Sequence, residues 1–387
     1  MGVPITYNLR NLVQRKGTTL MTALGIGLTV AVLVTSIALT QGLASVFAGS
    51  GDPRHLMVLR KGTDAELTSS ISADTYQIVR NLPGIAVGAD GQPLVSQEGV
   101  SVVNLHSVDN DHGMNVSVRG ILPVGLAMRN VKLEQGQMFS PGLRQVIVGS
   151  AIARRYPSAH IGGTVKFGRG DWQVVGVFSS GETAFNSEIW ADLNQLAGDY
   201  DRQGTPSSLL VRTQSQAALE SLTKTINDDQ RLGSQALTEK EYYAKLTESG
   251  ILIEGLGFSV AVIMAIGSAF AATNTMYAAV ARRSKEVGTL RALGFSKGMI
   301  LRSFILESVF LAMLGGILGV ILALPINGLT TGVGNFQTFS DVAFKFQVTP
   351  FAIAVGLAFA ACIGAMGGFL PAWAAARKDI VQAMREG

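Results

Sequence analysis

The sequence has a single cysteine and few charged residues. Charged residues make up 15% of its 387 residues, whereas an ordinary soluble domain has about 25%. Hydrophobic residues make up 48% of the chain, and its mean hydropathy is +0.33. These values disfavour a soluble globule and also argue against intrinsic disorder, which requires low hydrophobicity and high charge. A disulfide scaffold is excluded because Cys362 has no second cysteine with which to pair.

Motifs that carry catalysis are also scarce. The chain has no Gly-Lys dipeptide, which a Walker A loop requires, and neither H-E-x-x-H nor C-x-x-C. GFSKG at 294–298 fits G-x-S-x-G, but a basic helical stretch precedes Ser296, where a nucleophile elbow needs a strand. Asp109, Asp111 and His112 do not complete a calcium-loop pattern. We therefore predict that this chain is not an enzyme and has no metal site.

Four long stretches contain no charged residue, at 17–51, 255–281, 308–340 and 346–376. Each holds about 20 mostly apolar residues, which as a helix cross a hydrocarbon core of about 30 Å. We therefore predict transmembrane helices at 18–46, 250–281, 299–327 and 349–374. The first stretch could instead be a cleaved signal peptide, but it is longer than a usual h-region and no clear cleavage site follows it.

The charged residues near the ends of these helices are mostly basic. Three acidic residues, Glu286, Asp379 and Glu386, oppose twelve basic ones: Arg10, Arg15, Lys16, Arg282, Arg283, Lys285, Arg291, Lys297, Arg302, Arg377, Lys378 and Arg385. Because loops rich in Lys and Arg stay in the cytoplasm, we expect a cytoplasmic N-terminal tail (1–17), link (282–298) and C-terminal tail (375–387). We expect the chain to lie in the cell inner (cytoplasmic) membrane, in contact with membrane lipids. The pI of about 9.2 then reflects topology, and we predict no nucleic-acid partner.

The fold class predicted is an α-helical membrane protein with four transmembrane helices and a large mixed α+β extracytoplasmic domain between helices one and two. This domain spans 47–249, and a short extracytoplasmic loop spans 328–348. Runs of apolar, β-branched and aromatic residues predict strands at 55–60, 101–105, 115–120, 145–148, 164–167, 172–178 and 209–212. An amphipathic helix is predicted at 72–82, where Ser72 and Asp74 are N-terminal signals and Pro83-Gly84 is a stop. Further helices are predicted at 216–228 and 239–248, and the last runs into the second membrane helix, where it could act as a stalk.

Small residues recur at a spacing that lets membrane helices approach closely. Gly315 and Gly319 form G-x-x-x-G, with Gly316 beside them, and Ala23 and Gly27 have the same spacing. We expect these residues to pack helices within a bundle or to form a dimer seam.

Two acidic residues lie in or beside the membrane segments. An intramembrane carboxylate is a functional candidate by default. Glu254 is close to the outer end of helix two, which favours an unremarkable interfacial position. Glu307 lies about one turn beyond Arg302, so we expect it to pair with Arg302 or another basic residue.

The link between helices two and three is the most informative segment. Apolar residues recur in it at three-residue steps and would line one edge of a short helix: Val287, Leu290 and Leu293. Glu286 can reach back to Arg282 or Arg283, and Gly294 is a plausible helix stop. Such a helix could rest in the lipid headgroups or insert into a groove on a cytoplasmic partner.

Several stretches resemble MacB/FtsX-type ABC transporter permeases. EVGTLRALGFSKGMILRSFILESVFLAMLGGILG (286–319) and PAWAAARKDIVQAMRE (371–386) resemble the permease signature. VLRKGTDAELTSSISADTYQIVRNLPGI (58–85) resembles the start of a MacB-like periplasmic core domain, and NVSVRGI, QVIVGSAIA and WQVVGVF resemble its later strands. The resemblance extends over nearly the whole chain.

This resemblance implies a permease subunit that pairs with a separate cytoplasmic ABC ATPase subunit, which binds the ATP and Mg while this chain binds no cofactor. It also implies a second permease copy, as a homodimer or related heterodimer, and allows a periplasmic adaptor protein. In such proteins the link forms a coupling helix, and the residues expected to contact the ATPase are Arg282, Arg283, Glu286, Val287, Leu290, Arg291, Leu293 and Gly294.

The implied function is to couple ATP hydrolysis by the partner to motion of the periplasmic domain. This mechanotransmission would export or extract a lipid, lipoprotein, peptide or drug without a channel through the membrane. The alternative is an FtsX-like signalling or scaffold subunit that regulates an extracytoplasmic partner such as a cell-wall hydrolase.

Overall fold

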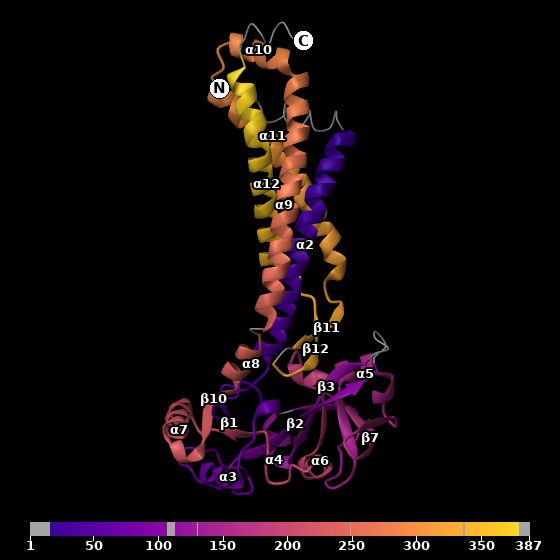
Figure 1. Cartoon of the computed structure of the whole chain (residues 1–387), viewed down its shortest axis with the longest axis vertical. Helices are drawn as coiled ribbons and strands as arrows, with labels where there is room; N and C mark the ends of the chain where they lie inside the picture. Colours follow the sequence, from indigo (N-terminus) through magenta and orange to yellow (C-terminus); the bar gives the residue numbers. More distant parts are fainter. Residues whose placement is uncertain (1–15, 107–112, 130, 248, 336, 379–387) are drawn as a thin grey trace. The chain divides into compact units, whose positions relative to one another are not determined.

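The computed structural model describes residues 16–378 except 107–112, 130, 248 and 336 (Figure 1). The chain divides into two units. We call the first, residues 1–41, 251–329 and 345–387, the helical unit. The second, residues 42–250 and 330–344, we call the interhelical domain.

Among the described residues, four helices are long and apolar enough to cross a membrane. They are α2 (Lys16–Gly49), α9 (Ser249–Arg282), α11 (Lys297–Ala323) and α12 (Pro350–Arg377). Their apolar spans cover Thr19–Gly49, Gly255–Arg282, Lys297–Ile326 and Pro350–Arg377. The prediction of four such helices is confirmed.

Hydroxyl groups and apolar side chains join the helices of the helical unit. The Oγ atoms of Thr29 on α2 and Ser268 on α9 lie 2.7 Å apart within hydrogen-bonding distance. The Ser308 hydroxyl on α11 donates to the Gly364 carbonyl on α12 at 2.7 Å. Hydrogen bonds of this kind replace the hydrophobic drive that lipid does not supply between membrane helices.

The interhelical domain is built on one mixed sheet. Its ten strands among the described residues are β1 (His55–Arg60), β2 (Val95–Leu105), β3 (Met114–Ile121), β4 (Lys132–Gly136), β5 (Gln145–Gly149), β6 (Thr164–Phe167), β7 (Gly170–Ser179), β8 (Glu188–Asp192), β9 (Ser208–Arg212) and β10 (Ser234–Thr238). The strand order is β10-β1-β9-β2-β3-β8-β5-β7-β4, with β6 paired to β7. The pairs β3–β8 and β5–β7 are parallel and the others are antiparallel. The predicted mixed α+β domain is confirmed.

Helices cover this sheet: α3 (Ala73–Arg80), α4 (Pro123–Arg129), α5 (Ser150–Arg155), α6 (Leu193–Asp199), α7 (Gln216–Asp228) and α8 (Glu239–Thr247). The hydroxyls of Ser72 and Ser215 cap α3 and α7 by accepting from backbone N–H groups. The cap at Ser72 is the one that the sequence predicts. α8 is described up to Thr247 and α9 from Ser249, and residue 248 between them lies outside the described residues. The short helices α4, α5 and α6 were not predicted, because six or seven residues carry no readable periodicity.

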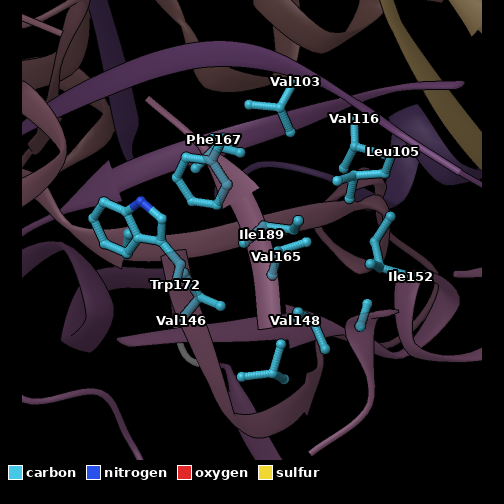
Figure 2. Close-up of a cluster of buried hydrophobic side chains, with 14 of the residues drawn as sticks. Val103, Leu105, Val116, Val146, Val148, Ile152, Val165, Phe167, Trp172 and Ile189 are labelled. Atoms are coloured by element: carbon cyan, nitrogen blue, oxygen red, sulfur yellow. The ribbon is translucent and has the colours of Figure 1, made fainter. Parts of the chain in front are cut away.

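Apolar side chains of the described sheet gather in two places. The first core includes Leu56, Val58, Val95, Leu209, Val211 and Ile226. The second core, shown in Figure 2, includes Val103, Leu105, Val146, Val148, Ile189 and Trp172, whose ring stacks on Phe167 at 4.8 Å. Burial of each such side chain contributes roughly 1.5–3 kcal/mol. β2 supplies residues to both cores and therefore joins them.

Residues 328–348, expected to be a short loop, contain a hairpin of β11 (Thr330–Asn335) and β12 (Ser340–Lys345). The hairpin belongs to the interhelical domain. Arg155 forms an ion pair with Asp341, and the Asn335 amide donates to the Leu246 carbonyl at 3.0 Å. The Ala343 N–H donates to the Ser187 hydroxyl at 2.8 Å. This segment is therefore a structured part of the domain, which its glycine-containing first strand, TTGVGN, concealed.

Candidate functional site

The link between α9 and α11 forms a helix and a tight turn. α10 (Ser284–Ala292) follows α9 directly, and Gly294, with a φ of +96°, ends it. This backbone conformation favours glycine, so the predicted helix stop is confirmed. The Ser296 hydroxyl then accepts from the Met299 N–H at 3.3 Å and caps α11. The serine of GFSKG therefore begins a helix, and no strand leads to it.

Arg283 holds the link against α11. It is 7% exposed, and its Nη1 donates to Glu307 Oε2 at 2.8 Å. Its Nε donates to Glu286 Oε2 at 3.1 Å, and its guanidinium lies 5.2 Å from the ring centre of Phe304. The partner of Glu307 is thus Arg283, not Arg302, and Glu286 pairs with Arg283, not Arg282. One guanidinium at the junction of α9 and α10 therefore joins α10 to α11.

The apolar edge of α10 is divided between the interior and the surface. Val287 is 4% exposed and packs with Ile300 and Phe304 of α11 and with Ala375 of α12. Leu293, in contrast, is 72% exposed. Val287 therefore anchors the link within the helical unit, while Leu293 presents an apolar side chain at its surface.

The eight residues expected to contact an ATPase fall into three groups. Arg282, Glu286, Leu293 and Gly294 are exposed, Leu290 and Arg291 are half-buried, and Arg283 and Val287 are buried. The exposed group is available to a partner in this conformation. Arg283 and Val287, the two buried residues, fix the position of α10.

The small residues of α2 and α11 lie against one another within one chain. A Cβ atom added at Gly315 would lie 2.7 Å from the Ala23 carbonyl oxygen, and one added at Gly27 would lie 3.0 Å from the Gly315 carbonyl oxygen. A Cβ atom at Gly319 would collide with the Gly27 carbonyl, and one at Gly316 would lie 2.8 Å from Ala360 Cβ on α12. These small residues therefore pack helices against one another within one chain.

The remaining candidates are the metal-binding residues and Glu254. No group of three His, Cys, Asp or Glu side chains in the described part of the chain could hold a metal ion. Asp109, Asp111 and His112 lie outside the described residues, as does the Glu254 side chain.

Two family profiles match the chain. The MacB-like periplasmic core domain matches residues 19–229, and the FtsX-like permease C-terminal region matches residues 258–380. The chain belongs to the MacB/FtsX-type ABC transporter permeases. Its four apolar helices and its MacB-like domain mark a multi-pass inner-membrane protein with an extracytoplasmic domain.

Relatives of the chain include both fused and stand-alone permeases. It is 27% identical over 396 residues to the macrolide export ATP-binding/permease protein MacB of Agrobacterium fabrum, covering 91% of this chain and 58% of MacB. The chain thus spans less than two thirds of that relative. It is 22% identical over 403 residues to the uncharacterized ABC transporter permease YknZ of Bacillus subtilis, covering 98% of each.

Solved structures similar to this chain include two extracytoplasmic domains. The periplasmic region of MacB from Actinobacillus actinomycetemcomitans has a TM-score of 0.38 and 14% identity, covering 50% of this chain and 92% of that one. The extracellular domain of the YknZ transporter has a TM-score of 0.36 and 16% identity, covering 48% of this chain and all of that domain.

Proposed function

We propose that the chain is the permease subunit of an ABC transporter that assembles with a separate ATP-binding subunit. That subunit would bind ATP and Mg, and its hydrolysis of ATP would move the interhelical domain on the extracytoplasmic side. Both termini and the link would lie in the cytoplasm, in agreement with the twelve basic residues near the helix ends. The cargo would be a lipid, lipoprotein, peptide or drug.

The construction of the link supports this proposal. α10 is tied to α11 by the buried pair of Arg283 and Glu307, and Val287 packs it against α11 and α12. A force applied to α10 therefore acts on several long helices at once, since packed interiors transmit displacement. The exposed Leu293 at the end of α10 supplies an apolar anchor of the kind that helix-in-groove contacts use.

A binding assay with matched variants tests the assembly. The full chain in detergent is used to capture the proposed ATP-binding subunit. We expect Leu293→Asp to abolish capture while the chain stays folded, because this side chain is already exposed. Leu143→Asp, at a leucine 50% exposed on the interhelical domain, is the control and should capture normally. Equal capture by both variants would contradict the proposal.

The signalling alternative differs in what happens outside the membrane. Reconstitution of both subunits in liposomes would show whether a lipid or lipoprotein leaves the bilayer when ATP is added. Cargo release supports transport. ATP-dependent activation of a cell-wall hydrolase with no release would instead favour an FtsX-like role.

A further inference from the structure

A continuous set of buried charged side chains crosses the interhelical domain. Its six members come from η1 (Glu66–Thr68), β2, β3, α4, β8 and α8, and each is less than a tenth exposed: Glu66, Glu98, Arg119, Arg129, Glu188 and Glu239. We call these residues the ion set. Four carboxylates share two guanidinium groups, so every link in the set is a charge-assisted hydrogen bond.

The two arginines connect the set from end to end. Arg129 donates to Glu239 at 2.8 Å and to both Glu98 oxygens, at 3.0 and 2.6 Å. Arg119 donates to Glu98 at 2.7 Å. It also binds Glu66 at 2.8 and 2.9 Å and Glu188 at 2.8 and 2.9 Å, in two bidentate pairs. Planar bidentate pairs fix orientation as well as distance.

Glu239 joins this set to the two segments that connect the domain with α2 and α9. The entry lead, residues 50–55, follows α2, and the exit lead, α8, begins at Glu239 and precedes α9. One carboxylate oxygen of Glu239 accepts from the Asp52 N–H at 2.9 Å and lies 2.9 Å from His55 Nδ1. Its other oxygen accepts from Arg129. Glu239, the first residue of the exit lead, therefore bonds directly to the entry lead.

The backbone of the entry lead is shaped to admit Glu239. Gly51 has a φ of +88°, a conformation that favours glycine. A Cβ atom at Gly51 would also lie 3.1 Å from Glu239 Cγ. Both the conformation and the close approach therefore require the residue found there.

The ion set reaches both hydrophobic cores. Glu98 lies on β2 between Val95, which belongs to the first core, and Val103, which belongs to the second. Glu188 lies on β8, directly before Ile189 of the second core. A displacement of Glu239 would therefore be felt on both sides of β2.

Stability alone does not account for so many buried charges. Burial by itself would raise the pKa of Glu239, but Arg129 and His55 outweigh it and hold this pKa at about 2. Buried ion pairs often stabilise a fold no better than apolar residues of the same size. What such a set supplies is a fixed geometry among the elements that carry it.

We propose that Glu239 is a positioning residue that fastens the entry and exit leads to both cores through Arg129 and the ion set. The leads and the two cores then move as one body. The inference rests on the proposed function, in which movement of this domain is the output.

Spin labels on the full chain in lipid nanodiscs test the fastening without any ATPase. Cys362→Ala gives a cysteine-free background, since this is the one cysteine of the sequence. Labels are placed at Ala244 on the exit lead and at Lys166 on β6 beside the second core, both exposed. We expect Glu239→Gln to broaden the distribution of distances between these labels.

The double variant Arg129→Gln/Glu239→Gln separates positioning from stability. Glu239 no longer carries a charge in the double variant, and Glu98 keeps Arg119 as its partner, so the melting temperature should fall less than in Arg129→Gln alone. The broad distance distribution should persist. Asp201→Asn, in an exposed pair with Arg169, is the control and should change neither. A narrow distribution in the double variant would overturn the inference.

A second measurement adds the ATP-binding subunit and ATP. The distance from a label at Lys166 to one at Leu322, exposed near the end of α11, should change with ATP in the parent chain. In the double variant this change should be lost while ATP hydrolysis continues. No change in the parent chain would contradict the proposed function. An equal change in parent and variant would contradict only the role of Glu239.

Discussion

Removing the Arg283 side chain should destabilise the helical unit far more than removing either of its partners. Arg283→Ala leaves the Glu307 carboxylate, 4% exposed, without its 2.8 Å partner. Breaking a buried ion pair from one side costs about 3–5 kcal/mol. Glu307→Ala should cost less, about 1.5–3 kcal/mol, because Arg283 keeps Glu286 as a partner. Glu286→Ala should cost at most about 1 kcal/mol, since this side chain is 55% exposed.

The pair can be isolated by a double-mutant cycle. The free energy of unfolding would be measured by titrating SDS into mixed micelles of the full chain and following circular dichroism. We expect Arg283→Ala/Glu307→Ala to be more stable than the sum of the single effects predicts, by about 0.5–3 kcal/mol. Additive effects within about 0.5 kcal/mol would refute the idea that this pair holds α10 against α11.

Three further predictions concern other parts of the chain. Gly319→Leu should destabilise the helical unit by about 1–3 kcal/mol in the same SDS titration, because even a Cβ atom there would collide with Gly27; Gly17→Leu, with open space around it, should not. The pKa of Glu239 falls from 4.5 to about 2 on folding, so the ionised carboxylate stabilises the domain above pH 4.5. On the order of 3 kcal/mol of the free energy of unfolding should be lost between pH 4.5 and 2. In an acid titration followed by circular dichroism, Glu239→Gln should lack this loss. Asp341→Asn should speed hydrogen exchange in β11 and β12, while unchanged exchange would show that Arg155 does not hold the hairpin.

The long helices and most strands were predictable because their signals are local. Charge-free runs of sufficient length define the four long helices, and β-branched residues define strands such as Gln145–Gly149. β4 was missed because its sequence, KLEQG, is polar and all five residues are exposed at the sheet edge. β8, EIWAD, begins and ends with an acidic residue, and β10, SQALT, is mostly polar, so neither sequence forms an apolar run that predicts a strand.

The pairing of distant charges could not be predicted. Arg155 and Asp341 are 186 residues apart, and Arg129 and Glu239 are 110 apart; nothing near either residue indicates its partner. In the link, helical spacing correctly suggested that Glu286 reaches an arginine. It could not show that Arg283 is buried, since burial depends on how α9, α10 and α11 pack.

The hairpin changes how freely the two units can turn. A domain attached through one linker can swivel about it, and such motion is the usual expectation. Here the division into units places backbone crossings after residues 41, 250, 329 and 344. Four covalent crossings restrain the rotation of one unit against the other more than a single linker does, and two of these crossings lie at the ends of the segment that forms β11 and β12.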